Sequence, residues 1–465
     1  MSDARVRPEV HFTAAHGWTN DPYGIHAAHG GYEMFFQYNP AGTEWSEKAQ
    51  WGHAASDDLI TWRELDVALT PLSDEIGCWS GSAVVDLDGS VAVYTRIADE
   101  DWGRGAVALA RPTSVGGNWA RVPARPVLDG PPDDLDIIAF RDPQLRRRGE
   151  AWVAVMGAGI RDRGGCALQY GVSADLTEWT FEGVLAERAN SEREPIWTGK
   201  VWECPQFLLV DGQWVLLVSV WEDDVLHNVV YAIGDYDGQS FAPRAWGTFS
   251  HGPQLYATTT FTDSQGRPCA MSWMRERDNR SPAASPWCSA MSLPHVLSLS
   301  GDSLQVRHHP ALDGYFIDQI VTRDLSAGDD ITAGVPEGPW RFRADVGCVS
   351  EMVLEVRAPQ GAVAWCLRAD ARQGLLIVTD GDGEVLARMT VVAGRGGALD
   401  AVVDADILEV TWSAGEGVVA VRVPMEESAM VHVKADGGAV NHVALMASTT
   451  SRTARGVIKA VDSSR

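Results

Sequence analysis

The chain has 465 residues, a formal net charge of −25 and a sequence pI of about 4.8. This negative charge would repel phosphate backbones and anionic lipid surfaces, so nucleic-acid and membrane partners are disfavoured and a neutral small-molecule ligand is favoured. The length exceeds what one ordinary globular core accommodates, which predicts two or three domains.

The N-terminal stretch MSDARVRPEVHF lacks the apolar centre of a secretory signal, and no later stretch approaches about eighteen uninterrupted apolar residues. We therefore expect a cytoplasmic protein. Its seven cysteines are scattered and show no CxxC spacing, which favours reduced thiols over a disulfide framework or a metal site.

Residues 20–300 are dominated by short runs rich in Val, Tyr, Phe and Trp, such as YEMFFQYNP, AWVAVMGAG and QWVLLVSVW. These runs are separated by turn-forming pairs such as DG, GG and NP. Helical periodicity is hard to find in this region, so the sequence predicts an all-β fold.

An internal repeat indicates which all-β fold this is. Four similar segments each end in an aromatic residue, at intervals of roughly 60 residues. These residues are Trp62, Trp119, Trp179 and Phe241. That period suits one four-stranded propeller blade with long loops, and residues 1–300 leave room for five blades. The sequence therefore predicts a five-bladed β-propeller.

Four polar residues keep the same period. Asp21, Ser80, Asp142 and Glu203 each lie near the start of a strand-like run, again roughly 60 residues apart. We expect them at equivalent positions of successive blades, on the strands that line the central channel. Three acids from different blades would then point into one cavity.

The repeat stops near residue 300. Residues 301–337 are predicted to be a linker, in which LDGYFIDQIVTRDL can hold a short helix. From 338 to 465 apolar and polar residues alternate, which predicts the two facing sheets of a β-sandwich. No catalytic constellation is evident in this second domain.

The three acids suit glycoside cleavage, which needs one carboxylic acid to protonate the departing oxygen and one carboxylate to attack the anomeric carbon. Asp21 lies between an amide and a proline in GWTNDPYG, and Asp142 follows Arg141, a cation able to keep it ionised or to bind hydroxyls. Glu203 lies in the apolar run VWECPQF, a setting suited to a proton donor.

Eight segments then carry a family resemblance: GWTNDPYG, FFQYNP, QWGHAASDDLITW, GCWSGSAV, FRDPQL, WECPQF, LYATTTF and SWM. In order and spacing they resemble glycoside hydrolase family 32, the invertase, levanase and inulinase family. The match is strong over residues 9–300 and weak beyond. The resemblance implies a catalytic propeller followed by a β-sandwich.

It also implies retaining cleavage of β-D-fructofuranosides without cofactor or metal. By resemblance Asp21 is the nucleophile, Glu203 the acid/base, and Asp142 the residue that holds fructose hydroxyls and stabilises the transition state. The residues implied to bind fructose are Asn20, Gln37, Trp45, Trp79, Ser80, Arg141 and Trp273.

The chain departs from the family pattern around these acids. Thr19 and Tyr23 replace a Met and an Asn of the nucleophile motif, Trp79 replaces the commoner Phe, and Gln254 replaces a frequent Asp. These departures concern the leaving-group side, where Tyr23 can present an aromatic face.

Two other functions stay open. A fructosyltransferase would form the same intermediate and pass it to a sugar acceptor, and a non-catalytic sugar-binding propeller would bind without cleaving. The natural substrate (sucrose, a short fructo-oligosaccharide, a levan-derived sugar or a phosphorylated disaccharide) and homo-oligomer formation also stay open.

Overall fold

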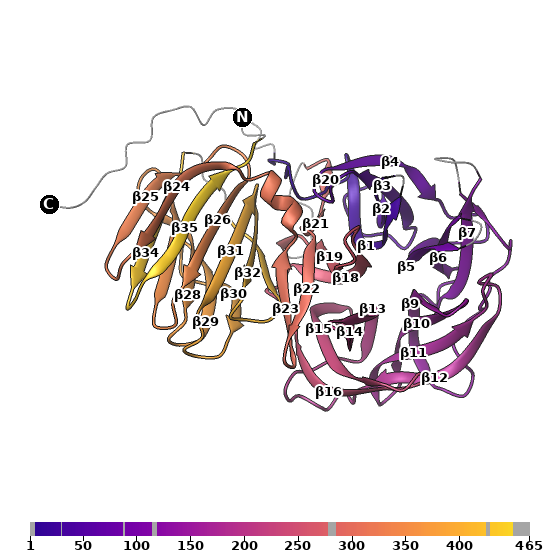
Figure 1. The fold of residues 1–465 in the computed structure, drawn as a ribbon. Coiled ribbons are helices and arrows are strands. Elements are labelled where there is room, and N and C mark those ends of the chain that lie inside the picture. Colours follow the sequence, from indigo (N-terminus) through magenta and orange to yellow (C-terminus); the bar gives the residue numbers. More distant parts are fainter. Residues whose placement is uncertain are drawn as a thin grey trace.

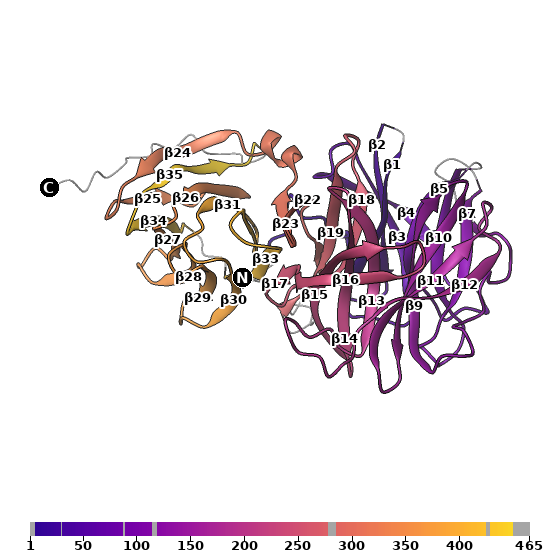
Figure 2. The same cartoon turned by 60° about the horizontal axis from the view of Figure 1, so that its bottom comes forward.

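A computed structural model describes residues 5–28, 30–86, 89–113, 119–277, 285–424 and 428–449. Figure 1 shows two bodies side by side, a ring of sheets at the N-terminal end of the chain and a pair of facing sheets at the C-terminal end. Figure 2 shows the same division from another side. The fold is a five-bladed β-propeller followed by a β-sandwich, as the sequence predicted.

Each of the first four blades is an antiparallel sheet whose strands follow chain order from the channel outwards. Blade 1 holds β1 (Gly17–Ala28), β2 (Gly31–Asn39), β3 (Gln50–Ser56) and β4 (Trp62–Leu69). Blade 2 holds β5 (Gly77–Asp86), β6 (Gly89–Ile97), β7 (Ala106–Pro112) and β8 (Trp119–Arg121). Blade 3 holds β9 (Ile137–Arg148), β10 (Ala151–Ile160), β11 (Gly164–Val172) and β12 (Trp179–Glu187). Blade 4 holds β13 (Val201–Val210), β14 (Gln213–Glu222), β15 (Val225–Tyr236) and β16 (Phe241–Thr248).

The fifth blade closes the ring. It holds β18 (Leu255–Thr262), β19 (Pro268–Met274), β21 (Ala290–Met291), β22 (His295–Ser300) and β23 (Ser303–His308). Just before β21, the short strand β20 (Trp287–Cys288) leaves this blade and pairs in parallel with β1, so that Gly17 lies opposite Trp287. The end of the propeller sequence is thereby joined to its beginning.

The aromatic repeat has a simple structural origin. Trp62, Trp119, Trp179 and Phe241 are the first residues of β4, β8, β12 and β16, the outermost strands of the first four blades. Neighbouring blades share buried apolar side chains, for example Val93 of blade 2 with Phe140 of blade 3. Strands covered on both faces need nearly continuous apolar runs, which explains AWVAVMGAG in β10.

The sandwich consists of two sheets around a separate apolar core. One sheet runs in the order β17 (Ser250–His251), β33 (Val418–Arg422), β32 (Ile407–Trp412), β31 (Gly397–Asp404), β26 (Trp340–Val346), β35 (Val440–Ala447) and β24 (Asp318–Leu325). The other runs in the order β25 (Asp330–Gly334), β34 (Met430–Asp436), β27 (Glu351–Arg357), β28 (Val363–Asp370), β29 (Leu375–Asp380) and β30 (Val385–Thr390).

The range 301–337, expected to be a linker, carries more structure than predicted. It contains β23 of the fifth blade, the short 3-10 helix η2 (Pro310–Gly314), and β24 and β25 of the sandwich. The exposed residues of β24 gave a weak apolar pattern because it is an edge strand, so it was not recognised from sequence. Residues 450–465 of the predicted sandwich range lie outside the described residues. In the described part of the chain, no helix has the length and apolarity needed to cross a membrane.

A buried ionic cluster joins the two bodies. The carboxylate of Asp404, at the end of β31, accepts hydrogen bonds from the backbone N–H groups of Glu9, Val10 and His11. The His11 ring lies 2.9 Å from Asp404 Oδ2 and 3.2 Å from Glu409 Oε1, one contact through each nitrogen. Burial lowers the pKa of His11, but the two carboxylates outweigh it and raise the pKa to about 9.

Candidate active site

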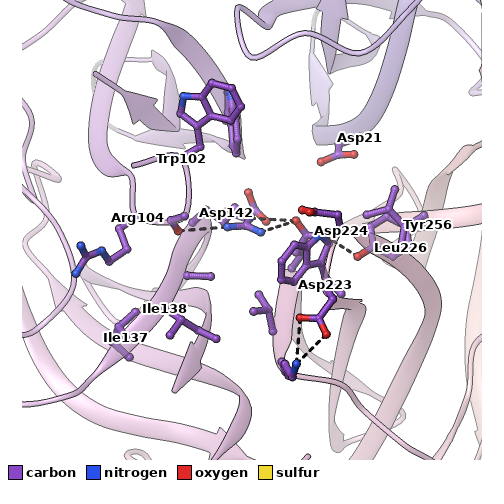
Figure 3. Close-up of a pocket in the computed structure, with 18 of the residues that line it drawn as sticks. Asp21, Trp102, Arg104, Ile137, Ile138, Asp142, Asp223, Asp224, Leu226 and Tyr256 are labelled. Carbon is purple, nitrogen blue, oxygen red and sulfur yellow. Dashed lines mark hydrogen bonds and ion pairs between the residues drawn. The ribbon is translucent and has the colours of Figure 1, made fainter. Parts of the chain in front are cut away.

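A cavity of about 1080 Å³ opens at the channel of the propeller. Nine of the ten residues predicted for the site line it: Asn20, Asp21, Gln37, Trp45, Trp79, Arg141, Asp142, Glu203 and Trp273. The tenth, Ser80, is buried and hydrogen-bonded to Asp21. Figure 3 shows Asp21, Asp142 and Tyr256 meeting in this cavity from different strands.

A bulge in the innermost strand of every blade positions these residues. The ladder is interrupted after Thr19 in β1, after Trp79 in β5, after Arg141 in β9, after Glu203 in β13 and after Tyr256 in β18. A bulge adds unpaired residues to one strand and redirects their side chains. Proline lacks the N–H that a regular ladder needs, which explains why Pro143 and Pro205 fit inside two of these interruptions.

The register also corrects the predicted equivalence of the three acids. Glu203 is the last paired residue before its bulge, Asp142 is the first residue inside its bulge, and Asp21 is the second. Asp142 therefore corresponds to Cys204, and both have a positive φ, 62° and 47°. The roughly 60-residue period identified the right region but could not resolve a one-residue offset.

The carboxylate of Asp21 is held by donors from two blades. Ser80 Oγ donates to Asp21 Oδ2 at 2.6 Å, and Asn20 Nδ2 donates to Asp21 Oδ1 at 3.0 Å. Gln37 bridges these donors, because its Nε2 reaches Ser80 Oγ at 2.7 Å while its Oε1 accepts from Asn20 at 3.1 Å. Both oxygens of Asp21 are thus fixed before any ligand enters.

Glu203 is held on the opposite side of the cluster by a cation and a phenol. Arg141 Nε and Nη2 both donate to Glu203 Oε1, at 3.0 and 2.9 Å. Tyr256 Oη donates to Glu203 Oε2 at 2.5 Å. The expected partner of Arg141 was Asp142, its sequence neighbour. Arg141 forms its ion pair with Glu203 instead, although its charge still lowers the pKa of Asp142.

Asp142 lies between these two groups. Its Oδ2 accepts the backbone N–H of Cys204 at 2.9 Å and lies 3.6 Å from Cys204 Sγ, which is also 3.6 Å from Asp21 Oδ2. Burial raises the pKa of Asp142 to about 7; Arg141 opposes this shift, and the charges of Glu203 and Asp21 add to it. Burial likewise raises the pKa of Asp21, although the Ser80 hydrogen bond opposes it.

Because the pKa of Asp142 is about 7, its own carboxyl group is partly protonated near neutral pH. Acid-assisted cleavage of a glycosidic bond needs one protonated and one ionised carboxyl group, and the cavity brings three carboxyl groups together.

Aromatic side chains form the walls. Trp273 is buried at the floor, with its ring centroid 5.6 Å from that of Trp18 and 6.5 Å from that of Tyr256. Trp45 is 45% exposed at the rim, and its ring centroid lies 5.8 Å from that of Trp79. It therefore does not fill the hydrophobic core. Trp18, Tyr256 and Trp102 also line the cavity and were not singled out from sequence. The segments GWTNDPYG and LYATTTF contain Trp18 and Tyr256, so motifs carried a signal for two of them, and Trp102 lies in no motif.

The expectation for Tyr23 is wrong. Its ring is 2% exposed and packs against Trp51 at 4.3 Å, within the core shared by blades 1 and 2. It is not among the residues that line the large cavity, and neither is the buried Gln254. Tyr23 follows Asp21 by two residues, but the intervening bulge ends before it and returns it to the packed side of the sheet.

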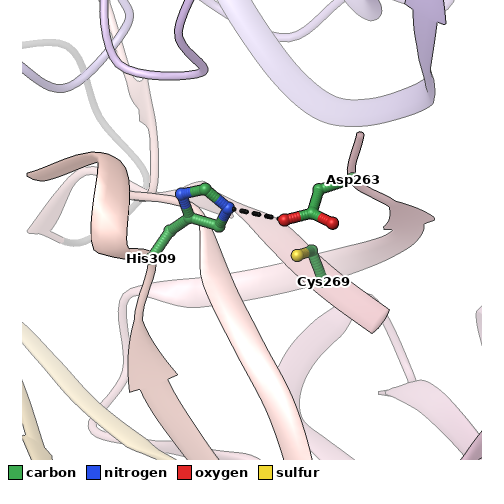
Figure 4. Close-up of side chains that lie close together, drawn as sticks. All are labelled: Asp263, Cys269 and His309. Carbon is green, nitrogen blue, oxygen red and sulfur yellow. Dashed lines mark hydrogen bonds and ion pairs between the residues drawn. The ribbon is translucent and has the colours of Figure 1, made fainter. Parts of the chain in front are cut away.

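A second cluster of polar side chains, Asp263, Cys269 and His309, lies in the fifth blade (Figure 4). Asp263 accepts Arg267 Nε at 2.6 Å and lies 3.1 Å from His309 Nε2. Burial would raise the pKa of Asp263, but backbone and side-chain hydrogen bonds outweigh it and lower the pKa to about 2. This carboxylate already has partners from the protein, and we interpret the cluster as a structural contact that links the β18–β19 turn to η2.

The fold and the cavity together define a five-bladed propeller with three carboxylates in its channel, an arrangement suited to glycoside cleavage. The chain matches the glycosyl hydrolases family 32 N-terminal domain over residues 11–310 and belongs to glycoside hydrolase family 32. It is 33% identical to a levanase of Bacillus subtilis over 336 residues, 66% of this chain and 46% of the levanase. It is 30% identical to a sucrose-6-phosphate hydrolase of the same organism, covering 66% of each chain.

Solved structures agree with this assignment over nearly the whole chain. A GH32 β-fructofuranosidase of Bombyx mori, solved as a mutant in complex with sucrose, superimposes with a TM-score of 0.81 at 25% identity, over 95% of this chain and 94% of that one. A sucrose-6-phosphate hydrolase of Lactobacillus gasseri shares the fold, with a TM-score of 0.80 at 21% identity over 96% and 94% of the two chains.

Proposed function

We propose that the protein is a retaining β-fructofuranosidase, which hydrolyses sucrose or short fructo-oligosaccharides through a fructosyl-enzyme intermediate. The observation that carries this proposal is the pair of differently held carboxylates in one cavity. Asp21 receives two side-chain hydrogen bonds that favour its ionised form, and Glu203 faces the same cavity from another blade. Family membership supports the same substrate class.

In the first step Asp21 attacks the anomeric carbon of the fructosyl unit and forms an ester bond. The bond from this carbon to the leaving oxygen breaks, and Glu203 transfers its proton to that oxygen. Ser80 and Asn20 hold the attacking carboxylate in place, so little reorganisation is needed when the substrate binds.

In the second step water attacks the same carbon, Glu203 accepts a proton from the water, and the ester to Asp21 breaks. Two inversions at one carbon give net retention. Between the two steps Arg141 and Tyr256 hydrogen-bond to the carboxylate of Glu203, which has given up its proton and can accept one from the attacking water.

Asp142 is assigned a different task, since it receives a backbone N–H from Cys204 and lies beside both reacting carboxylates. We infer that it binds fructose hydroxyls, and that its negative charge stabilises the positive charge that develops on the sugar ring.

Two measurements test this function. Incubation with concentrated sucrose, followed by chromatography, should give free fructose and glucose; oligosaccharides or anhydrides as main products would assign a fructosyltransferase instead. Binding of sucrose without any product would assign a non-catalytic sugar-binding protein.

The Glu203→Ala variant separates the two carboxylate roles. It should lose sucrose cleavage, because the leaving oxygen receives no proton, yet still react with a fructoside that has a good leaving group. Added azide, which needs no general base, should then restore turnover of that fructoside. Azide rescue at Asp21 or Asp142 with none at Glu203 would reverse the assignment.

A further inference from the structure

The cavity extends well beyond the three carboxylates, into an outer half that no family motif covers. This outer half is lined by the loop containing Trp102 and Arg104, by the β10–β11 turn at residues 161–163, and by the β14–β15 turn at residues 223–224. Figure 3 shows Trp102 and Arg104 on one side of the cavity and Asp223 and Asp224 on the other. In the proposed reaction this is where the leaving group lies.

One wall of the outer half is aromatic. Trp102 is 39% exposed, and its ring centroid lies 6.3 Å from that of Trp45, which in turn contacts Trp79. The backbone next to Trp102 is anchored to the reacting groups, because Gly103 O accepts Arg141 Nη1 at 3.3 Å. A large exposed indole at a cavity mouth offers a flat apolar face, which suits stacking on a sugar ring.

The cations of the outer half are all engaged by carboxylates. Arg104 pairs with Asp101 at 2.5 Å, Arg161 with Asp136 at 3.0 Å, Lys200 with Asp223 at 2.9 Å, and Arg163 with Glu187. None of these four is left without an acidic partner to receive an anionic ligand.

Two further carboxylates on the lining, Asp162 and Asp224, form no ion pair or hydrogen bond within the described residues. Both lie at turn positions, with φ values of 58° and 63°. The outer half therefore has an excess of negative charge close to the leaving group. Phosphate-binding sites have the opposite character, with cations free to pair with the phosphate oxygens.

We propose that the outer half binds a neutral sugar unit stacked on Trp102, and that Asp162 and Asp224 exclude leaving groups that carry phosphate. This inference rests on the proposed fructosidase function and selects among its substrates. The similar proteins named above include hydrolases of both phosphorylated and unphosphorylated substrates, and the charges here favour an unphosphorylated one.

The experiment compares kcat/KM for sucrose with kcat/KM for sucrose phosphorylated on the glucose 6-hydroxyl. We expect a preference for sucrose of at least about 100-fold, since juxtaposed like charges strongly weaken association. Raising the ionic strength from about 10 mM to about 500 mM should reduce this preference, because salt screens exposed charges. Equal or better cleavage of the phosphorylated sugar would overturn the inference.

A matched pair of double variants locates the effect. The double variant Asp162→Asn with Asp224→Asn should reduce the preference for sucrose over the phosphorylated sugar at least about tenfold, because two negative charges that repel the phosphate are removed. Glu178→Gln with Asp235→Asn changes the net charge equally at exposed positions outside the cavity, and should leave the preference as it is. If both double variants reduced the preference for sucrose equally, the net charge of the protein, and not the outer half of the cavity, would discriminate against the phosphorylated sugar.

Trp102 is tested with a smaller substrate. Trp102→Ala should raise KM for sucrose about tenfold while Trp102→Phe keeps KM near the original value, in line with aromatic stacking contributions. Methyl β-D-fructofuranoside, whose leaving group is too small to reach Trp102, should show a much smaller change. Equal KM changes for both substrates would show that Trp102 only supports the loop. A protein that cleaves none of these fructosides would instead contradict the proposed function itself.

Discussion

The protein has two buried clusters of charged side chains, one in the propeller channel and one between the propeller and the sandwich. They differ in how their carboxylates are paired. The channel brings Asp21, Asp142 and Glu203 together beside the guanidinium of Arg141 and leaves them facing a cavity. The interface brings Asp404 and Glu409 against the His11 ring, with each carboxylate engaged and all three groups buried.

The consequence appears in the proton affinities. In the channel, burial and like charges raise the pKa of Asp142 to about 7. At the interface the pKa of Glu409 is lowered, because hydrogen bonds from His11 and His295 outweigh the effect of burial. The comparison teaches that an unbalanced group of buried carboxylates binds a proton near neutral pH, whereas a buried carboxylate held by hydrogen-bond donors, such as Glu409, stays ionised and helps to hold two domains together.

The largest expected effect concerns the channel cluster and is tested by the Asp21→Asn variant. An amide cannot form the ester intermediate, so kcat should fall by about 10⁴-fold or more while the melting temperature stays close to the original. Steady-state kinetics with sucrose, alongside circular dichroism as a folding control, measures both. Retention of more than about a tenth of the activity would remove Asp21 from the nucleophile role.

For the interface half, Glu409→Gln leaves the His11 imidazolium with one buried carboxylate in place of two. The expected loss is about 3–5 kcal/mol in the free energy of unfolding, the usual cost of breaking a buried ion pair. The control is Glu182→Gln, whose partner Arg148 is substantially exposed, and which should cost less than about 1 kcal/mol. Urea unfolding compares them; equal losses would mean that the interface cluster contributes no more than a surface pair.

Asp142→Asn tests whether the unbalanced charge serves the reaction. Loss of a charge that stabilises the transition state should lower kcat by about 100- to 1,000-fold with the fold intact. Because the pKa of Asp142 is about 7, activity of the original protein should fall as pH drops through this region, and the variant should lack that acid limb. An unchanged rate would reduce Asp142 to a structural neighbour of Cys204.

The smallest expected effect is the pH dependence of the interface. The pKa of His11 is about 9 in the folded protein, above its ordinary value of 6.5, so its contribution is complete below about pH 6.5 and is lost as pH rises through 9. We expect a decline of about 2–3 kcal/mol over this range. Melting temperatures between pH 6 and 10 should show it, and His11→Asn should flatten the curve. A parallel decline in that variant would assign the effect to other groups.

Much of the propeller was predictable because its repeat is local. The outermost strands of the first four blades begin with an aromatic residue, and strands buried on both faces are apolar throughout, so the blades appear in the sequence as a period. The sandwich edge strand β24 and the interface cluster left no such pattern. Asp404 and Glu409 lie in an ordinary alternating stretch, and their partner His11 is almost 400 residues away in the chain.

The sequence by itself determined the all-β class, the blade count, the three acids of the channel and three of its aromatic residues, Trp45, Trp79 and Trp273, because strand pattern, repeat length and motif order are local properties. Only the tertiary structure decided how they are arranged: Arg141 pairs with Glu203 and not with its neighbour Asp142, Tyr23 is buried, and Trp102 lines the outer half of the cavity. The physical reason is the bulge in each innermost strand, since a shift of one residue reverses the direction of a side chain and a period of roughly 60 residues cannot register it.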